Sequence, residues 1–238
     1  MTANQMADEF EVIFDKITNN DSPGYEDTEI SVFLNRGLDE FVDDTYTGTN
    51  LTKESFEETE KRRKDLSELT SNAEITTPST SQTGNLPNGT IYDMPSDFLY
   101  AIKEEATISS EDECVDGRRI LVKPVSHDYY GNNIDNPFKK PFDELVWRVD
   151  YSRTTAGTGN KRHELITDGS YDITTYHVRY LKNPTAIVVN RTTPASMVNC
   201  ILDQSTHRRI IDRAVKIALE VTADPRLQTN VAISKANN

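Results

Sequence analysis

The stretch Tyr171–Glu220, YDITTYHVRYLKNPTAIVVNRTTPASMVNCILDQSTHRRIIDRAVKIALE, is the most apolar part of a hydrophilic chain. Tyr176, Val178 and Tyr180 alternate with polar residues, a period of two that is typical of a strand with one buried face. After a connecting segment that contains prolines, apolar residues recur at spacings of three and four. This spacing predicts a helix from Ser205, its N-cap, to about Ala223. We expect the core to form around this strand and this helix.

Apolar spacing also predicts helices at the other end of the chain. One covers residues 3–17 and a second begins near Asp27, which we expect to cap it. A third runs from Thr52 or Ser55 to about Thr70 and has few apolar residues, which indicates a surface that faces solvent or a partner. Three helices of this kind predict a small bundle.

Between these helical regions the sequence changes to short strands joined by turns. Residues 71–90 are rich in Ser, Thr, Asn, Pro and Gly, and they predict a linker with a short edge strand at 74–77. Asp168-Gly169 is a strong two-residue turn signal. Close spacing favours an antiparallel sheet, sandwich or small barrel. The expected strands cover 90–94, 99–108, 118–125, 145–151, 162–167 and 171–181.

The fold expected from these patterns is α+β. It has an N-terminal helical bundle, an antiparallel β-sandwich or small barrel as its body, and a C-terminal helix with a flexible tail. The expected organisation is an acidic helical segment at 1–70, a linker at 71–90, a β domain at 91–199, a helix at 200–224 that packs with the helical segment, and an extended tail at 225–238.

Charge is distributed unevenly along the 238 residues, whose net charge is −13. Residues 1–70 hold 18 acidic against 7 basic side chains, and the rest of the chain holds 21 against 19. An acidic surface repels a phosphate backbone, so sequence-specific binding of nucleic acid is not expected. The acidic residues form a solvated helical surface, meet a basic neighbour, or line a passage that DNA crosses without sticking.

The sequence carries no sign of a membrane span or of a secretory signal. It has no run of eighteen apolar residues, and its first residues lack a basic start followed by an apolar run. Its two cysteines, Cys114 and Cys200, fit synthesis in a reducing cytoplasm.

A search for chemistry finds no catalytic constellation and predicts neither a metal nor a cofactor. Gly157–Lys161 lacks the spacing of a phosphate-binding loop, and Asp112–Gly117 lacks the glutamate that a calcium loop needs at its twelfth position. The four histidines are scattered and predict packing or surface roles. We therefore expect an interaction or assembly component rather than an enzyme.

Several segments resemble structural proteins of tailed phages. They include IYDMPSDFLYAIKEE at 91–105, VKPVSHDYYGNNIDNPFKKP at 122–141, YHVRYLKNPTAIVV at 176–189 and CILDQSTHRRIIDRAVKIALEVT at 200–222. The chain is similar to the head-to-tail connector, or ring, proteins of crAss-like phages, which infect Bacteroides. More distantly it resembles the tail adaptor (tubular protein A) of short-tailed phages.

The resemblance implies a virion protein at the capsid–tail junction. It implies a ring of about twelve copies that docks under the portal protein, continues the DNA channel and forms a platform for the next tail ring. Genomic DNA would pass without sequence-specific binding. We expect partner contacts in the C-terminal tail, at Arg226, Leu227, Asn230, Val231 and Ile233. Two alternatives remain: a tail-associated enzyme that degrades cell wall or glycan, and an assembly or cargo-binding module.

Overall fold

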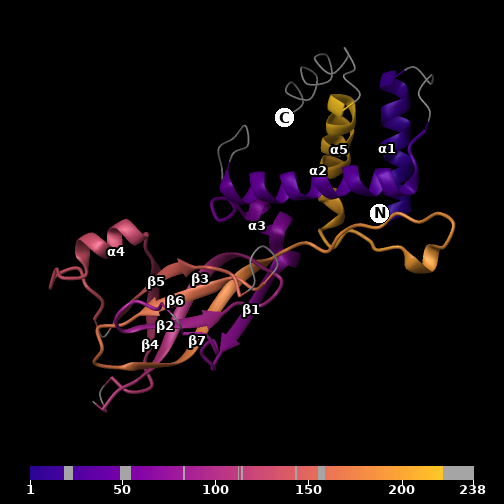
Figure 1. The fold of residues 1–238 in the computed structure, drawn as a ribbon. Helices are drawn as coiled ribbons and strands as arrows, with labels where there is room; N and C mark the ends of the chain where they lie inside the picture. The colour runs from indigo at the N-terminus through magenta and orange to yellow at the C-terminus, as the bar shows by residue number, and fades with distance from the viewer. Residues whose placement is uncertain are drawn as a thin grey trace. The chain divides into compact units, whose positions relative to one another are not determined.

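The computed structural model describes residues 1–18, 24–48, 55–82, 84–111, 113, 115–142, 144–154 and 159–221. The chain divides into two compact units. Unit 1 combines both ends of the chain, Met1–Leu69 and Pro184–Asn238, and unit 2 is the continuous stretch Thr70–Asn183. Unit 1 is helical and unit 2 contains the strands (Figure 1), so the predicted α+β class is confirmed.

Unit 1 is built on the helices α1 (Ala3–Thr18), α2 (Asp27–Thr47), α3 (Glu60–Leu66) and α5 (His207–Val221), with short 3₁₀ turns at Ser67–Leu69, Pro194–Ser196 and Gln204–Thr206. The apolar stripe of α5 packs against α1 and α2. Gly37 allows α2 to approach α5 closely, because a Cβ atom there would lie 2.8 Å from the carbonyl oxygen of Ile210.

The predicted N-cap residues of three helices are wrong, although the helices exist. Asp203 rather than Ser205 caps the turn that leads into α5, and its side chain accepts from the Ser205 N–H. Thr59 rather than Thr52 or Ser55 caps the third helix, which is only seven residues long. Glu26 rather than Asp27 is the N-cap of α2. Each expected cap has another polar residue within a few positions that takes this role, and sequence alone does not rank such candidates.

Unit 2 is one seven-stranded sheet that curls like a half-barrel (Figure 1), with strand order β1-β7-β3-β4-β5-β6-β2. Six strands lie within two residues of their predicted bounds at each end, whereas β1 is longer than the edge strand expected at 74–77. The strands are β1 (Thr70–Ile75), β2 (Gly89–Asp93), β3 (Phe98–Ser109), β4 (Arg119–Pro124), β5 (Leu145–Tyr151), β6 (Arg162–Ile166) and β7 (Asp172–Lys182).

One strand pair corrects the expectation of antiparallel pairing, because β4 and β5 are parallel. The connection between them contains the short helix α4 (His127–Asn133), which makes a crossover of the kind that parallel neighbours require. Tyr129 of α4 packs edge-on against the fully buried Trp147 of β5. The strands β5 and β6 are therefore covered on both faces, by α4 on one and on the other by a buried apolar cluster that includes Val146, Leu165 and Tyr176.

Candidate functional site

In unit 1, residues 184–203 run along α1 and α2 and are held by side chains that take the place of a neighbouring strand. The Asn35 side chain accepts from the Ile187 N–H at 2.7 Å and donates to the Ile187 carbonyl at 2.9 Å. Asn4 makes the same pair of bonds with Asn190, both at 3.1 Å. These bonds satisfy backbone groups that would otherwise be buried without partners. Residues 184–203 therefore form a fixed part of this unit.

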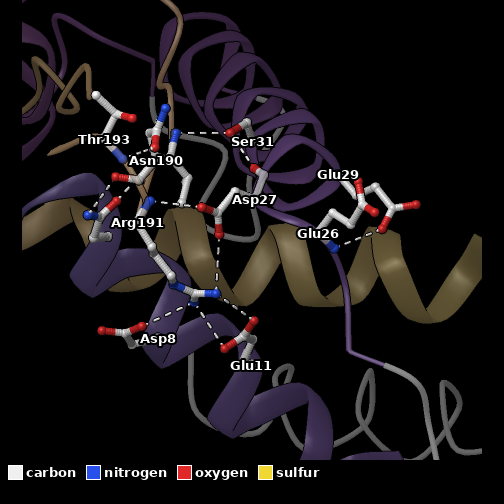
Figure 2. Close-up of polar contacts among 11 residues, drawn as sticks. Asp8, Glu11, Glu26, Asp27, Glu29, Ser31, Asn190, Arg191 and Thr193 are labelled. Carbon is white, nitrogen blue, oxygen red and sulfur yellow. Dashed lines mark hydrogen bonds and ion pairs between the residues drawn. The ribbon is translucent and has the colours of Figure 1, made fainter. Parts of the chain in front are cut away.

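Arg191 is the electrostatic centre of this segment (Figure 2). Its guanidinium makes two bonds to the Glu11 carboxylate, at 2.9 and 3.0 Å, and lies 3.1 Å from Asp8 and 3.3 Å from Asp27. The hydrogen bond to Glu11 raises the pKa of Arg191 above its usual value. One cation thus joins α1, α2 and the 184–203 segment at an otherwise acidic surface.

The same contacts explain why Asp27 does not cap α2. Its carboxylate accepts from the backbone N–H of Arg191 at 2.8 Å and is also paired with the guanidinium. The Glu26 N–H, at the start of the helix, donates instead to Glu29 at 2.9 Å (Figure 2). Asp27 therefore serves a long-range contact, and Glu26 and Glu29 cap the helix locally through a capping box.

The outer face of β1, β7, β3 and β4 is polar and hollowed, with a cavity of about 270 Å³. His177 lies in it, with Nε2 2.9 Å from the Thr107 hydroxyl and Nδ1 3.4 Å from Glu74. A hydrogen bond from Lys103 lowers the pKa of Glu105 on the same face. Interspersed charges of both signs suit a polar protein contact. The charged residues that line the hollow are Glu74, Lys103, Glu105, Arg119 and Arg179.

The interior of unit 2 holds a polar cluster that joins four strands. The Arg148 Nε atom lies 3.1 Å from Glu104, and its Nη1 atom lies 3.3 Å from His163 Nε2. Because a guanidinium only donates, His163 accepts through Nε2 and donates from Nδ1 to the Tyr176 hydroxyl at 2.9 Å. Burial lowers the pKa of His163 to about 3 and raises that of Glu104.

This cluster is enclosed rather than open to a substrate. Glu104, His163 and Tyr176 are each less than 7 % exposed. A buried ion pair and hydrogen bonds of this kind link the strands that carry them. We assign the cluster a structural role.

Other features that the sequence singled out stay apart. His127 and His207 begin different helices, α4 and α5. In the part of the chain that the structure describes, no three His, Cys, Asp or Glu side chains are grouped so as to hold a metal ion. None of the described helices is long and apolar enough to cross a membrane. The predicted partner contacts Arg226, Leu227, Asn230, Val231 and Ile233 lie outside the described residues.

Comparison with known proteins identifies the family. Residues 1–230 match the model of the family described as phage tail ring protein 3/4. The chain belongs to this family. It is 28 % identical over 228 residues to "Ring protein 3" of Bacteroides phage crAss001, an alignment that covers 92 % of this chain and 95 % of the relative. It is 26 % identical over 230 residues to "Ring protein 4/5" of the same phage, covering 92 % of each chain. The suspected relationship to the ring proteins of crAss-like phages is confirmed, and the match includes the strands of unit 2 and both ends that build unit 1.

Proposed function

We propose that this protein is a virion structural protein, a subunit of a connector ring at the head-to-tail junction of a crAss-like phage. The family match over residues 1–230 carries the proposal. Two relatives named as ring proteins align with more than nine tenths of this chain, so both units are shared with them. These names favour a structural role over the enzyme and cargo-binding alternatives.

In this proposal about twelve copies form a ring under the portal protein, continue the DNA channel and support further tail proteins. The acidic helical part of the chain supports a channel role, because carboxylates repel the phosphate backbone and let DNA pass. The polar hollow of the sheet offers a contact surface for a neighbouring tail protein. The C-terminal residues 226–233 remain our proposed contact with the portal protein.

Light scattering on the purified protein, alone and mixed with its portal protein, tests this function. We expect the chain to join the portal in about twelve copies. A chain that stays monomeric and ignores the portal would favour a lower tail ring, a cargo-binding module or an enzyme. An activity screen on cell-wall and glycan substrates would then separate the enzyme from the other two.

A further inference from the structure

The turn formed by residues 136–141, which we call the Phe138 turn, presents an aromatic ring to solvent. Phe138 is 95 % exposed. The turn is nevertheless well fixed: the Phe138 N–H donates to the Asn136 side chain at 3.0 Å, and the N–H groups of Lys139 and Lys140 donate to the Asn136 carbonyl at 3.0 and 2.9 Å. An aromatic side chain on a preorganised turn loses little conformational entropy when it binds, which is the property of an interface anchor.

Two further exposed apolar residues accompany Phe138, and we call Phe138, Phe142 and Leu121 together the apolar patch. Phe142 is 49 % exposed and forms a β-bridge with Leu145, which pairs in turn with Leu121, itself 55 % exposed. The Tyr171 hydroxyl donates to the Phe142 carbonyl at 3.0 Å and fixes the base of the turn to the sheet. Single exposed apolar residues are ordinary, but several on one turn and the strands beside it favour an interaction site.

The charge beside this patch indicates the chemistry of its partner. Lys139 and Lys140 are both exposed next to Phe138. A matching surface has an apolar centre with carboxylates beside it, so that the lysines meet opposite charge.

The outer face of α2 has this composition. Val32 is 57 % exposed, and the exposed side chains along the same helix include Glu29, Asp39, Glu40 and Asp43, with Arg36 as the one cation among them. Burial raises the pKa of Asp39, and repulsion by the neighbouring Asp43 raises it further by a smaller amount. Two lysines from a partner would relieve that repulsion.

We propose that the Phe138 turn of one copy docks on the outer face of α2 of the next copy. The inference rests on the proposed ring, because a ring needs a contact between two different patches on identical subunits. The first patch, the Phe138 turn, belongs to unit 2, and the second, the outer face of α2, belongs to unit 1. The acidic face of α2 then serves the neighbouring subunit, and other acidic residues of the N-terminal helices line the channel.

Zero-length carbodiimide crosslinking of the assembled wild-type ring tests the contact directly. The ring is formed from equal amounts of ¹⁴N- and ¹⁵N-labelled protein, with portal protein present if assembly requires it. We expect crosslinks from Lys139 or Lys140 to Asp39, Glu40 or Asp43 that join peptides of different isotope label. Crosslinks of these lysines only within one copy, or only to the portal protein, would overturn the proposal.

Substitutions test the contributions of the Phe138 ring and of the lysine–carboxylate pairing separately. Phe138→Ala should weaken ring assembly at least about tenfold, whereas Val12→Ala, at an exposed apolar residue of α1, should leave it unchanged. The double change Lys139→Glu and Lys140→Glu should also weaken assembly, and Asp39→Lys with Glu40→Lys should restore it. Circular dichroism of each variant checks that the fold is kept.

The two levels of the proposal fail differently. If wild-type protein assembles and these variants assemble equally well, the contact is wrong and the ring remains. If wild-type protein forms no ring with or without portal protein, the proposed connector ring under the portal is wrong, and the contact inferred within that ring falls with it.

Discussion

Gly37 shows how one residue controls the packing of the helical unit. Gly→Ala in a helix interior normally stabilises by about 0.5–1 kcal/mol, but a methyl group on Gly37 would lie against the backbone of α5. We predict that Gly37→Ala lowers the free energy of unfolding by about 1–3 kcal/mol, measured by urea denaturation. Gly131 of α4 is the control, because nothing lies within 4 Å of the position of its added methyl group. Gly131→Ala should not destabilise, and equal losses for both variants would contradict this account.

His163 should make stability depend on pH. Its pKa is about 3 in the folded protein and about 6.5 in the unfolded chain, so below pH 6.5 the unfolded chain binds a proton that the folded protein does not. The stability is fully present above pH 6.5 and falls as the pH drops toward 3. Between pH 7 and 5 this residue alone should remove about 2 kcal/mol.

The variant His163→Gln isolates this effect. Glu104 acts in the opposite direction, because its raised pKa favours the folded protein in acid, but it is present in both proteins, as are Arg148, Tyr176, Asp150 and Lys161 around it. Chemical denaturation at pH 7 and pH 5 should therefore show a smaller loss for the variant than for the wild type. Parallel losses would mean that His163 is not held neutral.

At the scale of elements, Arg191 should decide how firmly residues 184–203 are held to α1 and α2. We predict that Arg191→Ala destabilises unit 1 by about 1 kcal/mol and increases hydrogen exchange at the Ile187 and Val189 amides, which bond to Asn35 and Ser31 of α2. High salt should weaken the same protection in the wild type by screening the ion pairs.

Arg208 provides the matched control on the same unit. Its side chain is 81 % exposed. Within the described residues it makes one ion pair, with Glu9, at 3.6 Å. Arg208→Ala should leave exchange at residues 187–189 unchanged. If it raised exchange as much as Arg191→Ala, general charge rather than the Arg191 contacts would hold the segment.

Most elements could be predicted from the sequence because their signals are local. The period of two in β5 and β7 and the apolar spacing in α2 and α5 placed these elements within a few residues. The helix caps were less predictable, because Asp27 and Ser205 each lie within two residues of another side chain that can accept hydrogen bonds. The parallel pairing of β4 with β5 depends on where α4 packs, which no local pattern specifies.

The candidate sites were harder to predict because they are assembled from distant parts of the chain. Arg191 meets Glu11 and Asp8 across 180 and 183 residues of sequence, and Glu104 meets Arg148 from another strand. The Phe138 turn did have a sequence signal, since Pro137 and Pro141 bracket a phenylalanine and two lysines. What the sequence lacked was the exposure of that ring.

At the scale of the whole molecule, the C-terminal tail is the predicted contact with the portal. We predict that deletion of Arg226–Asn238 leaves the fold intact and abolishes portal binding, because the deleted residues include every tail contact proposed from the sequence. Circular dichroism and binding measured by light scattering check the two halves of this prediction.

A substitution control separates the effect of the tail's apolar side chains from the effect of its length. Replacing Leu227, Val231 and Ile233 by Ser keeps the chain length and should also weaken portal binding, since it removes the apolar contacts. A truncated protein with unchanged affinity for the portal would show that the contact lies elsewhere.

Unit 1 is built from both ends of the chain, and this fixes the order in which the protein can be completed during synthesis. The helices α1 and α2 leave the ribosome first, but the helix that covers them, α5, is made only after residue 207. Unit 2 is continuous in sequence, so its sheet can form before α5, the packing partner of α1 and α2, has been synthesised. An interrupted chain would therefore carry a finished sheet and an open helical core. Such a product would be recognised by proteases before it could enter a ring.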